Sequence, residues 1–170
     1  MRNAIITGSF DPVTAGHTDL FLRAARLFDT VTVVILANTE KSTGVFPPAD
    51  RLRLVEAAIG DLPADNLRAV LYGGLTSQIA KELGASFIVR GARCASDFDY
   101  EANLSLIMKR FDPDLETVIL PTNPALSMIS STYVRDLLKY GCELKGSVPD
   151  ACLPLMEELY RHSHTPANAK

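Results

Sequence analysis

The sequence has 170 residues, which suits one domain, and its 47% hydrophobic and 22% charged residues are ordinary values for a globular chain. Its formal net charge of −3 offers no basic footprint to nucleic acid or to an acidic membrane surface, so local charge must hold any phosphate ligand. The three cysteines lack CxxC spacing and are odd in number, which argues against a zinc site and a disulfide framework.

Five short apolar runs, rich in β-branched residues, alternate with segments of helical period. The runs are AIIT (4–7), VTVVILA (31–37), LRAVLY (67–72), SFIVR (86–90) and TVIL (117–120). Nearly continuous apolar runs of this length are typical of strands that are buried on both faces of a parallel sheet. The sequence therefore predicts five such strands.

Helices are predicted between the strands. Apolar residues recur every three or four positions in three segments, at Leu20, Phe21, Ala24, Leu27 and Phe28, at Leu52, Val55, Ala58 and Ile59, and at Ile79, Ala80 and Leu83. A fourth segment, DFDYEANLSLIMKRF (97–111), spaces its apolar residues less regularly but contains no helix breaker. Beyond the last strand, Ser130 is a suitable N-cap for STYVRDLLKY (131–140), and one more amphipathic helix follows.

Alternating strands and helices form βαβ units with right-handed crossovers. We therefore expect a Rossmann-like α/β fold: a doubly wound, parallel, five-stranded sheet in a single domain, residues 1–162, that ends in C-terminal helices. Residues 163–170 are polar and without period, and we expect them to form a flexible tail.

Sheets of this kind bind ligands beyond the carboxyl ends of their strands, where the first loop is GSFDPVTAGH (8–17). Gly8 lets the backbone approach a ligand closely, Ser9 offers a hydroxyl and an N–H, and Asp11 can cap the loop internally. His17 is expected at the N-terminus of the next helix, where free N–H groups and the helix dipole favour an anion. An ordinary Gly-containing turn with a capping histidine would show the same pattern.

Basic residues follow two other predicted strands. Lys41 comes after the second strand, although a lone lysine in a loop is usually a solvated charge. Arg90 and Arg93 flank a tight turn at Gly91 after the fourth strand and form a plausible phosphate grip, because a guanidinium binds phosphate oxygens in a bidentate manner. The alternative is that these arginines form ion pairs with Asp97 or Asp99.

The last of these loops is SMISSTYVR (127–135), which presents hydroxyls and N–H groups at a helix start, with Arg135 one turn on. A capping sequence alone would explain these residues equally well. Together, the loops supply two anion-binding helix starts and the basic side chains of Lys41, Arg90, Arg93 and Arg135, without a strong covalent nucleophile. This inventory favours phosphoryl or nucleotidyl transfer by positioning and charge stabilisation.

Four segments, GSFDPVTAGH, the Lys41 loop, RGARCASDFDYE and ISSTYVR, resemble in order and spacing the signature segments of the bacterial phosphopantetheine adenylyltransferase family, over about residues 3–160. The wider nucleotidyltransferase superfamily is marked by HxGH, and Thr14 in its first position, giving TAGH, is a feature of this branch. The resemblance implies transfer of the adenylyl group of ATP to 4′-phosphopantetheine, which yields dephospho-coenzyme A and pyrophosphate in the penultimate step of coenzyme A biosynthesis.

The resemblance also implies roles for individual residues. His17 is expected to bind ATP and to stabilise the charge that develops on the α-phosphate, and Lys41 to hold the acceptor phosphate near the reacting phosphorus. Ser9 is expected to contact both substrates, and Arg90 and Thr76 to line the phosphopantetheine site. The other residues expected to bind ATP are Phe10, through its backbone N–H, and Gly91, Ala92, Arg93, Glu101, Leu126, Ser127, Met128, Ile129, Ser130, Ser131 and Thr132.

Two departures from the family pattern affect the adenine and ribose contacts. Some members have tryptophan where this chain has Leu126. The loop TNPAL (122–126) also carries one residue more than the family pattern ahead of that position.

Further expectations concern cofactors, partners and location. The resemblance implies Mg²⁺ as its ATP complex, coenzyme A as a feedback ligand and a homohexamer, while the chain shows no carboxylate cluster for a metal site of its own. No apolar run approaches the roughly 18 residues of a spanning helix, and no signal peptide is recognisable, so we expect a cytoplasmic protein that binds neither membrane nor nucleic acid.

Two other functions stay open. The first is an adenylyltransferase for nicotinamide or nicotinate mononucleotide, because ISSTYVR suits that class, although Thr14 and RGARCASDFDYE count against it. The second is a nucleotide sensor without catalysis. The joint presence of His17, Lys41, Arg90 and Arg93 argues against it, because a sensor would not need both the acceptor grip and the transition-state histidine.

Overall fold

The computed structural model describes residues 1–37 and 44–164. Its strands are β1 (Asn3–Gly8), β2 (Thr30–Leu36), β3 (Leu67–Tyr72), β4 (Phe87–Ala92) and β5 (Glu116–Pro121). Its α-helices are α1 (Ala15–Leu27), α2 (Pro48–Gly60), α3 (Thr76–Glu82), α4 (Ala95–Phe111), α5 (Ser131–Tyr140) and α6 (Leu153–His164), and short 3₁₀ turns cover Pro124–Leu126 and Asp150–Cys152. The predicted strands and helices are therefore all present, with ends that shift by a few residues.

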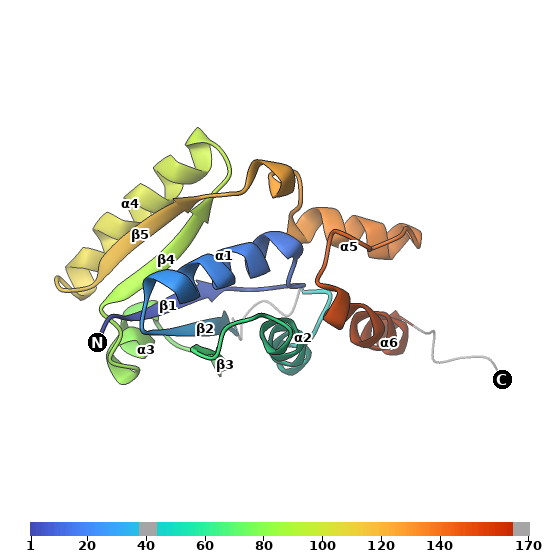
Figure 1. Cartoon of the computed structure of the whole chain (residues 1–170), viewed down its shortest axis with the longest axis horizontal. Helices are drawn as coiled ribbons and strands as arrows, with labels where there is room; N and C mark the ends of the chain where they lie inside the picture. The colour runs from blue at the N-terminus through green and yellow to red at the C-terminus, as the bar shows by residue number, and fades with distance from the viewer. Residues whose placement is uncertain (38–43, 165–170) are drawn as a thin grey trace.

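The five strands form one parallel sheet in the order β3-β2-β1-β4-β5 (Figure 1). The chain winds outward from β1 to β3, then crosses back to β4 on the other side of β1. This order confirms the expected doubly wound, Rossmann-like sheet. It also places β1 beside β4, so that the two strands direct their following helices to opposite faces of the sheet.

Neighbouring residues of each central strand belong to different cores. Ile6 of β1 packs with Phe21 of α1 and Leu54 of α2 in the larger cluster, whereas Ile5 packs with Ile79 of α3 in the smaller one. This alternation follows from the two-residue period of a strand. Helices α1 and α2 thus cover one face of the sheet, and α3 and α4 cover the other.

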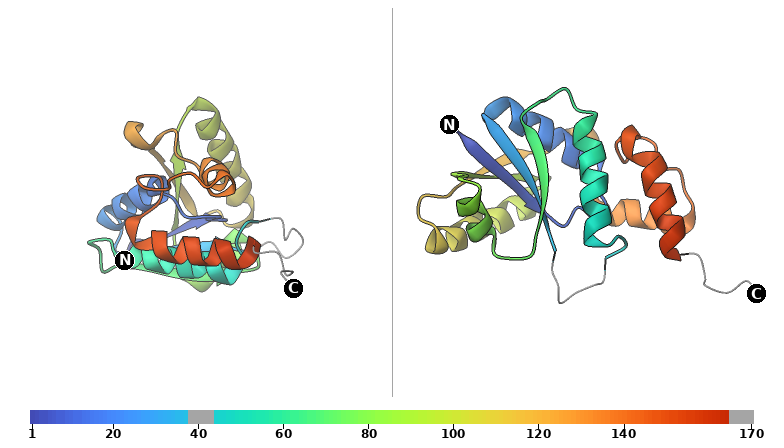
Figure 2. Two further views of the ribbon diagram at one scale, coloured as in Figure 1. Left: turned by 90° about the vertical axis from the view of Figure 1, so that its right-hand side faces the viewer. Right: turned by 90° about the horizontal axis from the view of Figure 1, so that it is seen from below.

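The C-terminal helices extend the larger core beyond the end of the sheet. Val134 of α5 and Met156 of α6 are fully buried in it. Figure 2 shows α6 lying alongside α2. Ser130 caps α5 by accepting a hydrogen bond from the Tyr133 N–H at 3.1 Å, and Gly141 ends the helix with φ of 66°. The predicted cap is therefore confirmed.

Three local features refine the expectations. The edge strands β3 and β5 are only partly buried, because each has a neighbour on one side alone. Helix α4 buries Glu101 and no other described residue, in agreement with the irregular spacing of its apolar positions. Strand β4 continues past Arg90 to Ala92, so Gly91 lies in a strand and not in a turn.

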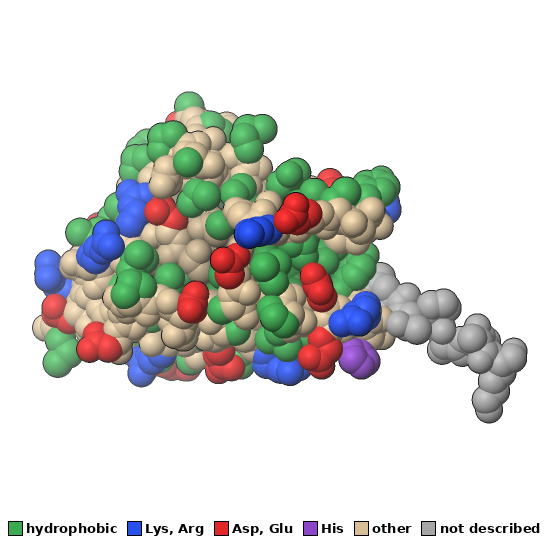
Figure 3. All heavy atoms as spheres, turned by 45° about the vertical axis from the view of Figure 1, so that its right-hand side comes forward, with side chains coloured by type: hydrophobic (Ala, Val, Ile, Leu, Met, Phe, Trp, Pro, Cys, Tyr) green, Lys and Arg blue, Asp and Glu red, His purple; other side chains and the backbone are tan. Residues whose placement is uncertain are grey.

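The described surface mixes both signs of charge. On the face shown in Figure 3, acidic and basic side chains are interspersed among apolar ones. Within the part of the chain that the structure describes, no helix combines the length and the apolar composition needed to cross a bilayer.

Candidate active site

A cleft of about 580 Å³ opens at the carboxyl end of the sheet, where β1 and β4 lead to helices on opposite faces. Such a switch point is the usual ligand site of an open α/β sheet. The predicted site residues that line the cleft are Ser9, Phe10, His17, Arg90, Gly91, Arg93, Glu101, Ile129, Ser130, Ser131 and Thr132. Three loops that are remote in the sequence thus meet at one cavity, as the sequence predicted.

The remaining predicted site residues are not among the described residues that line the cleft. Lys41 falls outside the described residues, so its position stays a prediction. Thr76 begins α3, away from the cleft lining. Ala92, Leu126, Ser127 and Met128 are also absent from that lining, and their roles stay predictions.

Helix α1 adds two charged lining residues, Asp19 and Arg23, that sequence reasoning missed. Arg23 donates a hydrogen bond to the Pro121 carbonyl oxygen at 2.7 Å, and its Nη1 lies 3.3 Å from a carboxylate oxygen of Asp19. In the sequence these two residues look like an ordinary surface pair on one helix turn. Only the fold brings them to the end of β5.

His17 occupies the third position of α1, and its ring is held on both sides. The Thr14 N–H donates to the ring Nδ1 at 3.0 Å, while the Thr14 side chain caps the helix through the His17 N–H. The ring meets Phe10 edge-on at 5.0 Å between centroids and stacks towards Phe21 at 6.4 Å. Because Nδ1 accepts a hydrogen bond, the proton of the neutral ring lies on Nε2.

The environment of His17 favours that neutral ring. Burial, followed in order of effect by the positive charges of Arg93 and Arg90, lowers the pKa of His17 from 6.5 to about 4. At neutral pH, His17 is therefore an uncharged Nε2–H donor at a helix N-terminus, which suits it to bind an oxyanion.

The opening loop has structural reasons for its composition that differ from the predicted ones. A Cβ on Gly8 would lie 2.9 Å from the Phe10 ring, so this glycine makes room for Phe10. The Asp11 carboxylate does not cap its own loop. It accepts hydrogen bonds from the N–H groups of Val45 and Phe46, both at 2.9 Å. Asp11 thereby ties the loop after β1 to the segment before α2.

Arg90 spans the cleft wall between β1 and α4. Its Nε and Nη2 each contact a carboxylate oxygen of Glu101 at 2.7 Å, and its Nη1 donates to the Thr7 carbonyl oxygen at 2.6 Å. The arginine that forms an ion pair with Asp97 is Arg93, and its Nε lies 3.0 Å from the Asp97 carboxylate. Hydrogen bonds from the Arg93 N–H and guanidinium hold the pKa of Asp97 below its usual range.

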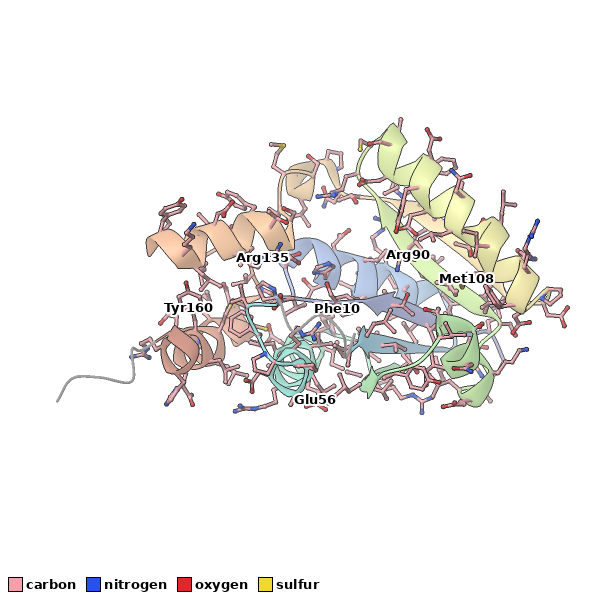
Figure 4. All side chains as sticks on the ribbon, turned by 180° about the vertical axis from the view of Figure 1, so that it is seen from behind. Phe10, Glu56, Arg90, Met108, Arg135 and Tyr160 are labelled. Carbon is pink, nitrogen blue, oxygen red and sulfur yellow. The ribbon has the colours of Figure 1, made fainter. Side chains whose placement is uncertain are left out.

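The start of α5 is fastened to the opening loop. Ser131 donates its hydroxyl to the Pro12 carbonyl oxygen at 2.9 Å, and Arg135 donates to the Asp11 carbonyl oxygen at 2.7 Å. Arg135 also contacts the Thr132 hydroxyl at 2.9 Å. In Figure 4, which shows the molecule from behind, Phe10 lies between Arg135 and Arg90.

The cleft is therefore bounded by the N-termini of two helices, α1 and α5, and lined by the guanidinium groups of Arg90, Arg93 and Arg135. This arrangement suits a ligand with several phosphates, because helix N-termini and arginines both favour anions. Among the described residues, no three His, Cys, Asp or Glu side chains are grouped as a metal site would require.

Comparisons with known proteins agree with this geometry. The cytidylyltransferase-like family model matches residues 5–137. The crystal structure of a Vibrio parahaemolyticus protein described as a nicotinate-nucleotide adenylyltransferase superposes with a TM-score of 0.72 over 95% of this chain and 96% of that chain, at 20% identity. At that identity the superposition supports the fold.

Curated relatives extend the agreement to nearly the whole chain. Phosphopantetheine adenylyltransferase of Lachnoclostridium phytofermentans is 36% identical over 160 residues, which cover 94% of this chain and 96% of the relative. The enzyme of the same name from Shouchella clausii is 40% identical over 161 residues, covering 95% and 99%. The resemblance predicted from four short segments is thus confirmed, and the chain belongs to the phosphopantetheine adenylyltransferase family.

Proposed function

We propose that this chain transfers the adenylyl group of ATP to the 4′-phosphate of 4′-phosphopantetheine, releasing pyrophosphate and forming dephospho-coenzyme A. The observation that carries the proposal is the neutral His17, held at a helix N-terminus with Nε2–H as its donor in a cleft lined by arginines. The names of the curated relatives supply the acceptor. The mononucleotide alternative and the sensor alternative have no comparable support.

In the proposed reaction, an oxygen of the acceptor phosphate attacks the α-phosphorus of ATP in line, and the bond from that phosphorus to the bridging oxygen of pyrophosphate breaks. His17 donates from Nε2 to the α-phosphate, where negative charge increases in the transition state. Lys41 holds the acceptor phosphate beside the α-phosphorus, and the Phe10 N–H and the start of α5 bind ATP. Catalysis then consists of orientation and charge neutralisation, without a covalent intermediate.

The proposal also includes the metal ion, the feedback ligand, the oligomeric state and the cellular location. Mg²⁺ enters with ATP as part of the substrate, and coenzyme A, which shares the phosphopantetheine arm, acts as a feedback ligand. The homohexamer is supported by the large apolar side chains that α4 leaves exposed, among them Phe98, Leu106 and Phe111. The reaction takes place in the cytoplasm, where ATP is supplied.

The experiment that tests the function is pyrophosphate release from Mg–ATP by the purified chain, with 4′-phosphopantetheine and nicotinamide mononucleotide offered in parallel. Release with 4′-phosphopantetheine alone is expected. Release with the mononucleotide alone would assign the chain to the other acceptor class. ATP binding without release in either reaction would favour the sensor and overturn the proposal.

A further inference from the structure

Arg51 is a buried arginine that does not line the cleft, yet it holds the loop that does. It lies in the first turn of α2, and only 8% of the residue is exposed. Its Nη1 donates a hydrogen bond to the Ser9 carbonyl oxygen at 2.8 Å. We propose that Arg51 is a positioning residue that orients the Ser9–Phe10 peptide for binding the phosphates of ATP.

The planar peptide carries the effect of Arg51 into the cleft. The Ser9 carbonyl and the Phe10 N–H belong to one trans peptide unit, so they point in opposite directions. Since Arg51 holds the carbonyl from outside the cleft, the N–H is directed to the cleft side. No described residue accepts a hydrogen bond from this N–H, which leaves it available to an anion.

Without the hydrogen bond from Arg51, the backbone conformation at Phe10 would favour rotation of the Ser9–Phe10 peptide away from the cleft. Phe10 has φ of 45°, in the left-handed region that non-glycine residues rarely adopt. Rotating the Ser9–Phe10 peptide by about half a turn would return φ to the common negative region and would point the N–H away from the cleft. The hydrogen bond from Arg51 opposes this rotation.

Arg51 also lowers the stability of the folded state in one respect. Its Nε is buried and has no hydrogen-bond partner among the described residues. A buried donor without an acceptor destabilises the folded state. An arginine is therefore better explained here by the orientation of the peptide than by packing, because an apolar side chain of similar length would avoid this cost.

Other carbonyls of this loop and of the end of β1 are also held by side chains, but these side chains line the cleft themselves. Arg90 holds Thr7, Arg135 holds Asp11 and Ser131 holds Pro12. Each of these side chains could also contact a ligand directly. Arg51 is different because an effect on nucleotide affinity would have to pass through the Ser9–Phe10 peptide.

The test compares Arg51→Met with the control Arg53→Met. Arg53 is an exposed arginine of the same helix, and it pairs with Asp50. The probe is α,β-methylene-ATP with Mg²⁺, titrated calorimetrically well below the unfolding midpoint of each variant. We expect Arg51→Met to weaken binding about tenfold to a hundredfold, as for the loss of a hydrogen bond from a charged group, and Arg53→Met to stay within about twofold of the parent. Arg51→Lys should recover part of the affinity, since an ammonium can still donate to the Ser9 carbonyl.

Unchanged affinity in folded Arg51→Met would overturn the proposal, whatever the unfolding midpoint does, because Arg51 would then support the structure alone. If Arg51→Met does not fold, Arg51→Gln is judged by the same criterion. The inference rests on the proposed function only through ATP binding. A parent protein that binds the analogue but releases no pyrophosphate with 4′-phosphopantetheine would refute the function and leave this test valid, whereas a parent that does not bind the analogue would refute both.

Discussion

Between pH 5 and pH 8, we expect the imidazole of His17 in the ligand-free protein to remain neutral. Burial, and then the charges of Arg93 and Arg90, lower its pKa from 6.5 to about 4. A lowering of the pKa of this size corresponds to about 3 kcal/mol against the imidazolium. Protonation would also place a second N–H on Nδ1, opposite the Thr14 N–H that now donates to it at 3.0 Å.

The assay is a titration of the histidine Cε1–H signals by ¹H–¹³C NMR, with His17 assigned by its loss in a His17→Gln variant. At pH 5.5, about 3% of His17 should be protonated, compared with about 91% of a histidine of pKa 6.5. Adding the Mg²⁺ complex of α,β-methylene-ATP should raise the pKa of His17, because the phosphates favour the imidazolium. A midpoint near 6.5 without ligand would refute the conclusion that the cleft holds this ring neutral.

The same shift predicts a pH dependence of stability. The folded pKa of His17 lies below the unfolded one, so the unfolded chain binds more protons between pH 6.5 and pH 4. The contribution is fully present above pH 6.5 and is lost as the pH falls towards 4. At pH 5.5 the loss amounts to about 1.4 kcal/mol, which urea unfolding of the parent and of His17→Gln can resolve as a difference in pH slope.

Three substitutions test the chemistry and the cleft wall. His17→Ala should lower kcat far more than it weakens ATP binding, because the proposed interaction strengthens in the transition state; equal losses in kinetics and calorimetry would make His17 a ground-state ligand or a helix cap. Lys41→Ala should raise the KM for 4′-phosphopantetheine and lower kcat, whereas an unchanged kinetic profile would identify Lys41 as a solvated charge. Glu101→Gln should cost about 2 kcal/mol in urea unfolding, because it leaves the partly buried Arg90 without its matching charge. The control Glu116→Gln, at an exposed ion pair with Lys109, should cost less than about 1 kcal/mol, and equal costs would contradict this reasoning.

Features that depend on near neighbours in the chain were accessible to sequence reasoning. The strand periods, the Ser130 cap and the place of His17 in the first turn of a helix were all predicted and are all observed. Each of these features depends only on interactions between residues that are a few positions apart in the chain. The order of strand and helix also predicted the cleft, because parallel strands place their carboxyl ends at one edge of the sheet.

Partners that are distant in the chain were not accessible in the same way. Arg90 was expected to pair with Asp97 or Asp99 if it formed an ion pair, and it pairs with Glu101 across the strand–helix junction. Asp11 was expected to cap its own loop, and it binds the segment before α2. Such choices depend on where side chains converge after the strands are ordered, which no local pattern encodes.

By itself, the sequence determined the alternation of strands and helices, the loops that carry the chemistry and the family to which they belong, because apolar period and motif spacing are properties of the chain. Only the tertiary structure decided the protonation of His17 and the hold of Arg51 on the Ser9–Phe10 peptide. The physical reason is that burial, neighbouring charge and hydrogen-bond geometry arise from segments that meet only when β1 lies beside β4 and α2 packs against the opening loop.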